Sequence, residues 1–212
     1  YAYVANVLRD SLAVIDISNP SDPVFVSEER GPQAGVSLDF ASSVFVSGNY
    51  AYVTTELRNS LAVIDISNPS DPVFVSEERG PIPGTSLSGA DSVFVSGNYA
   101  YVASQSRASL AIIDISNPFD PIFVAEERGP SGGTTLNGAH SVFVSGNYAY
   151  VASQTRDSLA VIDVSNPQDP VFVAEEQGPV PNTSLDNAKS VFVSGNYAYL
   201  ASANRASLAV ID

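Results

Sequence analysis

The chain has no cysteine, methionine or tryptophan, a single histidine, and 9 Lys and Arg residues against 23 Asp and Glu residues. The missing cysteines exclude disulfide scaffolds, thiol nucleophiles, iron–sulfur clusters and Cys-type zinc sites, and one histidine excludes a His-rich metal site. A net charge of −14 leaves no basic footprint for nucleic acid and disfavours an anionic membrane surface. No apolar run approaches about 18 residues, so neither a transmembrane helix nor membrane insertion is predicted.

What the chain does contain is a repeat. Tyr-Ala-Tyr begins at residues 1, 50, 99, 148 and 197, always 49 residues apart. We therefore treat residues 1–212 as one array without a linker, made of the units 1–49, 50–98, 99–147, 148–196 and a partial unit 197–212. The first residue is not Met and no signal-peptide pattern is present, which favours a window of a longer array. The alternative is a complete chain whose ends are covered by other chains.

Each unit carries four short segments rich in β-forming residues. In the best-defined stretch they are Ser92–Ser96, Tyr99–Ala103, Leu110–Ile115 and Ile122–Glu126. Gly97-Asn98 suits a two-residue hairpin turn because both residues tolerate positive φ, and a turn with two prolines separates the third and fourth segments. No segment shows an apolar stripe at helical spacing.

This pattern predicts an all-β protein built from β-propeller-type blades of four antiparallel strands. Several segments are apolar on both faces, which suits sheets stacked between neighbours. With about 4.3 repeats the chain is expected to hold 18 strands and to be open-ended. A parallel β-solenoid is the alternative, but its coils are usually shorter than 49 residues.

Two stretches of every unit resemble a known family. Ser-Gly-Asn-Tyr-Ala-Tyr-Val-Ala, followed by Ser-Leu-Ala-Val-Ile-Asp-Ile-Ser-Asn-Pro-x-Asp-Pro-Val, is similar to the LVIVD repeat, and the match covers essentially the whole chain. The resemblance implies a bacterial or archaeal β-propeller of a secreted or cell-surface protein. It implies no catalytic residues, because the family pattern is structural. The near identity of the copies departs from typical members.

The copies differ in a restricted way. Units 1–49 and 50–98 differ at 10 of 49 positions, all within Ala5–Asp10 or Gln33–Ser42 and their counterparts. Because strand direction alternates, both windows are expected on one edge of the ring, here called the variable edge. Such an edge suits ligand recognition, although loops also drift where little constrains them. The candidate residues are Asp39, Phe40, Asp91, His140, Asn182, Lys189, Arg58, Arg107 and Arg156.

Two aspartate series recur at the turn between the third and fourth strands. Aspartates supply the hard oxygen ligands that calcium prefers, yet aspartates in turns commonly accept backbone N–H bonds. We expect turn stabilisation and no cofactor, with calcium as the alternative. The residues concerned are Asp16, Asp22, Asp65, Asp71, Asp114, Asp120, Asp163 and Asp169.

An arginine column, at residues 9, 58, 107, 156 and 205, could form an anion-binding ladder. Pairing with the nearby Glu-Glu pairs, between blades, is the favoured interpretation. Adjacent glutamates point to opposite faces of a strand and cannot flank one bond. His140 stands alone in the sequence, and repetition argues against one asymmetric catalytic site, so an enzyme is not expected.

The sequence thus predicts a non-enzymatic, extracellular or cell-surface structural protein. Its open ends would expose unpaired edges and apolar faces, which favours contact with other copies or with further repeats of the same chain. The alternative function is a lectin-like or adhesive binding module that uses the variable edge to hold a glycan or a surface protein.

Overall fold

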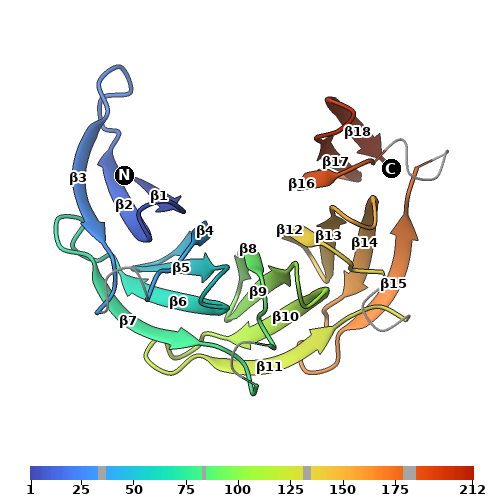
Figure 1. Ribbon diagram of the computed structural model, residues 1–212, viewed down its shortest axis with the longest axis horizontal. Helices are drawn as coiled ribbons and strands as arrows, with labels where there is room; N and C mark the ends of the chain where they lie inside the picture. Colours follow the sequence, from blue (N-terminus) through green and yellow to red (C-terminus); the bar gives the residue numbers. More distant parts are fainter. Residues whose placement is uncertain (33–36, 83–84, 131–134, 179–184) are drawn as a thin grey trace.

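The computed structural model describes residues 1–32, 37–82, 85–130, 135–178 and 185–212. Eighteen strands form five antiparallel sheets that stand side by side along an arc (Figure 1). We call these sheets blades 1 to 5 in chain order. In each four-stranded blade the first strand lies on the inner side of the arc and the fourth on the outer side. The predicted all-β class, blade type and strand number are confirmed, and antiparallel pairing rules out the parallel solenoid.

The strand bounds follow the repeat closely. Blades 2, 3 and 4 have four strands, whereas blades 1 and 5 have three. The strands are β1 (Ala2–Asn6), β2 (Ser11–Asp16) and β3 (Val24–Glu29) in blade 1; β4 (Ala41–Ser47), β5 (Tyr50–Thr55), β6 (Ser60–Asp65) and β7 (Val73–Glu78) in blade 2; β8 (Ala90–Ser96), β9 (Tyr99–Ser104), β10 (Ser109–Asp114) and β11 (Ile122–Glu127) in blade 3; β12 (Ala139–Ser145), β13 (Tyr148–Ser153), β14 (Ser158–Asp163) and β15 (Val171–Glu176) in blade 4; and β16 (Ala188–Ser194), β17 (Tyr197–Ser202) and β18 (Ser207–Ile211) in blade 5.

The hairpin between the first two strands of a four-stranded blade depends on its glycine. Gly97 has a φ of +58°, while Asn98 is not among the residues with positive φ. A positive φ at the first central residue alone is the pattern of a type II′ turn. Only the glycine therefore uses the conformational freedom that the Gly-Asn pair offers.

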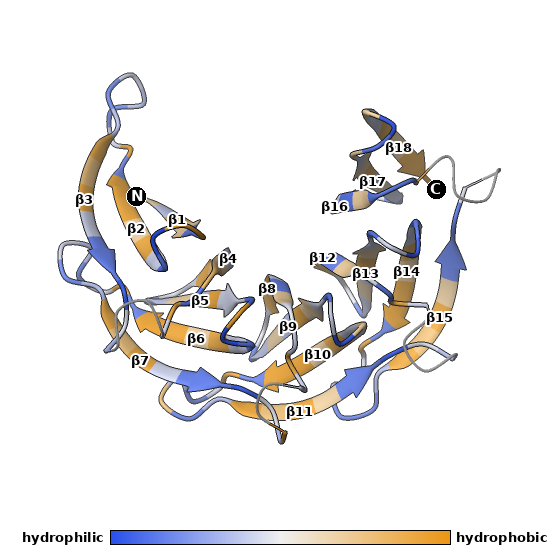
Figure 2. Ribbon diagram, viewed as in Figure 1, coloured by the Kyte–Doolittle hydropathy of each residue, from blue (hydrophilic) through white to orange (hydrophobic). Residues whose placement is uncertain are grey.

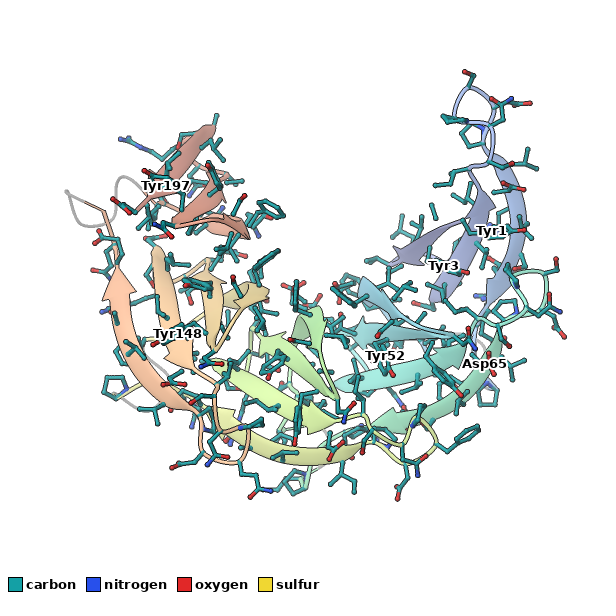
Figure 3. The ribbon with its side chains drawn as sticks, turned by 180° about the vertical axis from the view of Figure 1, so that it is seen from behind. Tyr1, Tyr3, Tyr52, Asp65, Tyr148 and Tyr197 are labelled. Carbon is teal, nitrogen blue, oxygen red and sulfur yellow. The ribbon has the colours of Figure 1, made fainter. Side chains whose placement is uncertain are left out.

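Each blade presents two different faces to its neighbours. The face that we call aromatic packs on the face of the next blade that we call aliphatic. Hydrophobic residues occupy much of the strands (Figure 2), and their side chains project between neighbouring sheets (Figure 3). Tyr52 lies in the junction between blades 2 and 3. At the junction of blades 3 and 4, the aromatic face consists of Phe94, Tyr99, Tyr101, Leu110 and Ile112, and the aliphatic face of Val142, Val144, Ala149, Val151, Ala160 and Ile162.

The two arms of the arc expose one half each of this repeated junction. On blade 5 the aromatic face is open, with Phe192 56% and Leu208 66% exposed. On blade 1 the aliphatic face is open, with Val4 42% and Phe25 62% exposed. The count of strands in the sequence predicted open ends with exposed apolar faces. The interior junctions show which surface fits each of them.

A side-chain clasp on the variable edge joins blade 1 to blade 2, blade 2 to blade 3 and blade 4 to blade 5. The turn that contains the repeated arginine also contains a residue of positive φ. The side-chain oxygen of this residue accepts a backbone N–H bond from the residue that directly precedes the first strand of the next blade. The bonds are Phe40 N to Asp10 Oδ1 (2.9 Å), Gly89 N to Asn59 Oδ1 (2.9 Å) and Asn187 N to Asp157 Oδ1 (2.8 Å). Blade 3 has Ala108 at this position and cannot form the clasp.

Replacing Ala108 with Asn is expected to stabilise the protein. Ala108 has a φ of +57°, a conformation that Asn adopts more readily than Ala. The new amide oxygen can accept the Gly138 N–H, as Asn59 does from Gly89. A net gain of about 1 kcal/mol in unfolding free energy is expected from urea titration. Ala206→Asn, at a φ of +48° with no following blade in this structure, is the control and should gain less. Equal gains would contradict the clasp.

Candidate ligand-binding site at the inner rim

A β-bulge shapes the start of the innermost strand in blades 2 to 5. The pairing of β8 with β9 skips one residue between Ala90 and Ser92, and the same shift recurs in β4, β12 and β16. Bulges leave the extra residue unpaired and redirect its side chain. The bulged residues are Ser42, Asp91, His140 and Lys189, chemically the most varied column of the array. The bulges therefore present different functional groups at equivalent places on successive blades.

Three of the predicted candidates meet at this rim. His140 Nε2 lies 3.4 Å from Asp91 Oδ2, and the side chains are 26% and 15% exposed, respectively. Lys189 Nζ donates to Gln154 Oε1, which also accepts a bond from Gln105 Nε2 at 3.2 Å. His140 is thus not isolated, and the asymmetry that sequence repetition argued against is present.

The cluster contains three residues that the sequence analysis missed, Glu56, Gln105 and Gln154. They occupy one column at the end of the second strand, whose other members are Val7 and Ala203. The column falls inside the variable Ala5–Asp10 window and its counterparts, so variation in charge and polarity along it was the available signal. We call Glu56, Asp91, Gln105, His140, Gln154 and Lys189 the rim cluster.

Burial dominates the electrostatics of the rim cluster. It raises the pKa of Asp91 to about 6, and the Lys189 charge opposes part of this rise. Burial also raises the pKa of Glu56, with a further contribution from Asp91, and lowers the pKa of His140, helped by Lys189. Near neutral pH, Asp91 is therefore ionised and His140 is neutral. A carboxylate held in a place that disfavours its charge is typical of a functional site.

Asp91→Asn is expected to raise stability at pH 7 by about 2 kcal/mol, because the folded pKa exceeds the unfolded value by roughly two units. The loss of stability caused by the ionised carboxylate is absent below the pKa of Asp91 in the unfolded state. It grows as the pH rises towards 6 and is constant at higher pH. The advantage of the variant over the wild type should accordingly vanish near pH 4, as measured by urea unfolding at several pH values.

The His140 contribution has the opposite sign and needs its own control. A lowered folded pKa means that stability falls as the pH drops below the unfolded value of about 6.5. The Asp91→Asn comparison is therefore repeated in a His140→Gln background. A gain that is the same at pH 4 and pH 7 would contradict burial of the Asp91 charge.

The other candidate residues on the variable edge that the structure describes have structural partners. Phe40 has a φ of +59° and belongs to the clasp. The negative charge of Asp39 helps to raise the pKa of Arg58. Asn182 lies outside the described residues. The arginines bind glutamates of their own blade, so pairing between blades was wrong: the turn and the fourth strand are adjacent within one sheet. The pairs are Arg58–Glu77 (2.7 Å), Arg107–Glu126 (2.5 Å) and Arg156–Glu175 (2.6 Å).

The first aspartate series caps turns on the opposite edge. Asp65 Oδ1 accepts a bond from Ser67 N at 2.8 Å. In the same way, Oδ1 of Asp16, Asp114 and Asp163 accepts a bond from the backbone N–H of the serine two positions later. These bonds lower the pKa of Asp16, Asp65 and Asp163. In the second series, the backbone N–H groups of Asp22, Asp71, Asp120 and Asp169 donate to an Asn carbonyl three residues earlier. Across the described ranges, no three His, Asp or Glu side chains gather as a metal site would require.

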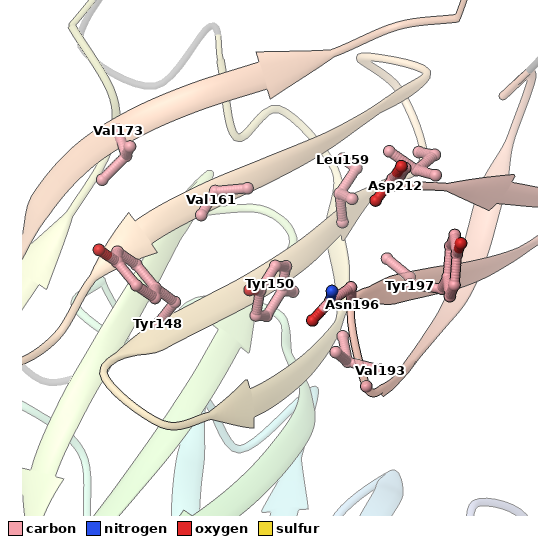
Figure 4. Close-up of a pocket in the computed structure, with 12 residues that line it drawn as sticks. Tyr148, Tyr150, Leu159, Val161, Val173, Val193, Asn196, Tyr197 and Asp212 are labelled. Atoms are coloured by element: carbon pink, nitrogen blue, oxygen red, sulfur yellow. The ribbon is translucent and has the colours of Figure 1, made fainter.

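A mainly apolar cavity lies at the junction of blades 4 and 5. About 430 Å³ in volume, it lies between blades 4 and 5 and is lined by Tyr148, Tyr150, Val161, Val173 and residues of β17 and β18 (Figure 4). At the interior junctions a phenylalanine from the next blade's fourth strand, such as Phe123 or Phe172, packs against the corresponding core. Blade 5 has three strands, which leaves this place open.

In the described part of the chain, no helix is long and apolar enough to cross a membrane.

Comparison with known proteins identifies the family. A family model described as LVIVD repeat matches residues 1–28, 40–77, 89–126, 138–175 and 186–212. The chain belongs to the LVIVD repeat family, as the sequence motifs suggested. No curated protein matches the sequence significantly.

Several solved structures share the fold. A functionally unknown protein from Desulfotomaculum acetoxidans is 15% identical with a TM-score of 0.71, over 99% of this chain and 65% of that one. The periplasmic gluconolactonase of Pseudomonas aeruginosa is 18% identical with a TM-score of 0.76, over 98% and 61%. The Cps50 (Swd1) β-propeller domain of Myceliophteria thermophila is 13% identical with a TM-score of 0.71, over 98% and 65%. The chain thus spans less than two thirds of these structures, and such identities show a propeller-like fold alone.

Proposed function

We propose that this chain is a non-enzymatic binding scaffold whose rim cluster holds a carbohydrate-type ligand, a small molecule with several hydroxyl groups. The observation that carries the proposal is the convergence of Asp91, His140 and Lys189 from three blades onto one rim. Carboxylates accept bonds from neighbouring hydroxyl groups, glutamine amides both donate and accept, and an ammonium donates. Charges of both signs within one partly buried cluster suit a neutral polar ligand.

The non-enzymatic part of the proposal rests on what surrounds His140. Among the described residues, no hydroxyl is hydrogen-bonded to its imidazole, so the nucleophile–base contact of covalent hydrolysis is missing. The amide of Gln154 engages the Lys189 ammonium. Although one structural neighbour is named a gluconolactonase, 18% identity supplies only the fold.

A glycan array followed by calorimetry on the best sugar tests the proposal. Asp91→Asn and Lys189→Met are expected to weaken binding about ten-fold each, since each removes a charged hydrogen-bonding partner. Asp114→Asn, on the opposite edge of the array, is the matched control and should leave the affinity unchanged. Absence of any bound sugar, or equal losses in all three variants, would refute carbohydrate binding at the rim.

A structural role is the second candidate, favoured by the complementary faces on the two arms. Each exposed face is half of the junction that interior blades share, so it suits another blade of the same repeat type, from this polypeptide or from a second copy. The family resemblance supports an extracellular or cell-surface setting for either role. Light scattering across protein concentration tests self-association. Phe192→Ser should reduce it, whereas Phe119→Ser, at a 68% exposed side chain in a turn, should not. A strict monomer at all concentrations would contradict it.

A further inference from the structure

A second polar cavity lies on the variable edge, outside the rim cluster. It has a volume of about 240 Å³ and is lined by Thr85, Ser88, Ser106, Arg107 and Arg128. The connection from blade 2 to blade 3 meets the turn between β9 and β10 of blade 3 here, and Arg107 N donates to Ser88 O at 2.9 Å. Among the described residues, the lining contains three hydroxyl groups, two guanidinium groups and no carboxylate.

Arg128 breaks the pattern of its own column. In the other blades the equivalent residue donates to the backbone oxygen of the repeated turn arginine. These bonds are Arg30 Nε to Arg9 O (3.1 Å), Arg79 Nη2 to Arg58 O (3.2 Å) and Gln177 Nε2 to Arg156 O (3.4 Å). Arg128 makes no such bond within the described chain, and its Nε is fully buried without a partner. The Nε of Arg79 is also unpaired, but its Nη2 is bound.

The carboxylates nearest in sequence are already engaged. Glu126 binds Arg107 through both of its oxygens, at 2.5 and 2.9 Å, and Glu127 Oε1 accepts the Gly129 N–H bond at 2.5 Å. They do not neutralise Arg128 through a contact. Within the described chain the Arg128 guanidinium thus has no hydrogen-bond acceptor, and it lines the cavity, so an acceptor that enters the cavity gains a charge-assisted bond.

The other blades lack this combination in their sequence. The position of Ser88 is occupied by Asp39, Asn137 and Asp186, and that of Ser106 by Leu57, Thr155 and Asn204. Asp39 places a negative charge near Arg58 in blade 2. Blade 3 alone combines two arginines with hydroxyl groups at both positions.

We propose that this cavity binds a small oxyanion, a carboxylate, phosphate or sulfate group, through the Arg128 guanidinium and the surrounding hydroxyls. An oxyanion presents several acceptors to the planar guanidinium fork, and the Ser88 and Ser106 hydroxyls can donate to its remaining oxygens. The site stands apart from the rim cluster and does not depend on carbohydrate binding there. It gives this strongly acidic protein one local attraction for anionic groups.

Titration of the full chain with inorganic phosphate, sulfate and succinate, by calorimetry in chloride buffer, tests the site. Two variants use residues that other blades already carry: Arg128→Gln copies Gln177, and Ser88→Asp copies Asp39. Both should fold and should weaken anion binding about ten-fold or more. Arg79→Gln is the control and should leave the affinity within about two-fold, because Arg79 does not line the cavity.

The three anions distinguish the sources of the shared chemistry. Tighter binding of succinate would assign the site to carboxylates, and tighter binding of phosphate or sulfate to tetrahedral oxyanions. Wild-type protein that binds none of them in the millimolar range would overturn the proposal. So would a loss for Arg79→Gln as large as that for Arg128→Gln, since the anion would then be held by general positive charge.

Discussion

Leu110→Ala is expected to lower the free energy of unfolding by about 3–5 kcal/mol. Leu110 is fully buried in the junction between blades 3 and 4, on the aromatic face of β10. Truncation removes apolar contacts and leaves a cavity between two sheets that backbone pairing holds in place. The neighbouring residues cannot collapse into it without shifting a whole blade. Urea titration of the purified chain measures the loss.

The repeat supplies an unusually well-matched control. Leu208 has the same place in its strand and the same Ser-Leu-Ala context, but it is 66% exposed on the aromatic face of blade 5. Leu208→Ala should cost less than about 1 kcal/mol. Equal costs at low protein concentration would contradict the buried junction as the source of stability. A Leu208→Ala cost that grows with concentration would instead show the blade 5 face covered by another copy.

Strand positions were predictable because each unit carries its own local signals. Strand boundaries are set by the Ser-Val-Phe-Val-Ser segment, the Gly-Asn turn and the paired prolines. The same signals recur in four copies of the repeat. The pairing of Arg58 with Glu77 was harder. The two residues are 19 positions apart, and the sequence does not show whether the chain between them stays in one sheet or passes to the next. Only the fold shows that both lie in blade 2.

The rim cluster was only partly predictable, for a physical reason. Asp91, His140 and Lys189 are 49 residues apart, so in the sequence they look like substitutions at one variable position. Stacking the blades along an arc turns that column into neighbours in space. The bulge that redirects these side chains has no clear sequence signal. Glu56 and Gln154 directly follow the second strand of their blades. They reach the cluster only because neighbouring blades pack side by side.

The same reasoning explains Arg128, whose difference from its column is invisible in the sequence. Arg30, Arg79 and Arg128 are identical residues in nearly identical surroundings. Only the fold shows that Arg30 and Arg79 donate to the turn arginine of their blade while Arg128 does not. The adjoining turn also differs, with Ser106 in blade 3 and Leu57 in blade 2. Functional variety in this array therefore resides in the contacts between a uniform framework and a few variable positions beside it.

Gly80→Ala is expected to lower the free energy of unfolding by about 3 kcal/mol. Gly80 follows the fourth strand of blade 2 with a φ of +75°. A Cβ atom there would lie 2.3 Å from Ser86 Cβ and 2.9 Å from Ser86 Oγ. The left-handed conformation costs about 1–2 kcal/mol for any residue with a Cβ, and the overlap forces the connection to blade 3 to move.

Gly97→Ala separates the two contributions. Gly97 also has a positive φ, +58°, but a Cβ atom there would have no neighbour within 4 Å. This variant should therefore pay only the conformational part, about 1–2 kcal/mol, in the same thermal or urea unfolding experiment. Adding Ser86→Gly to Gly80→Ala removes the Cβ that is struck and should recover part of the difference. If Gly80→Ala and Gly97→Ala were equally destabilising, the close approach of the blade connection to Gly80 would not exist in solution. The difference between them measures how tightly the connection that carries Thr85 and Ser88 is held against its blade.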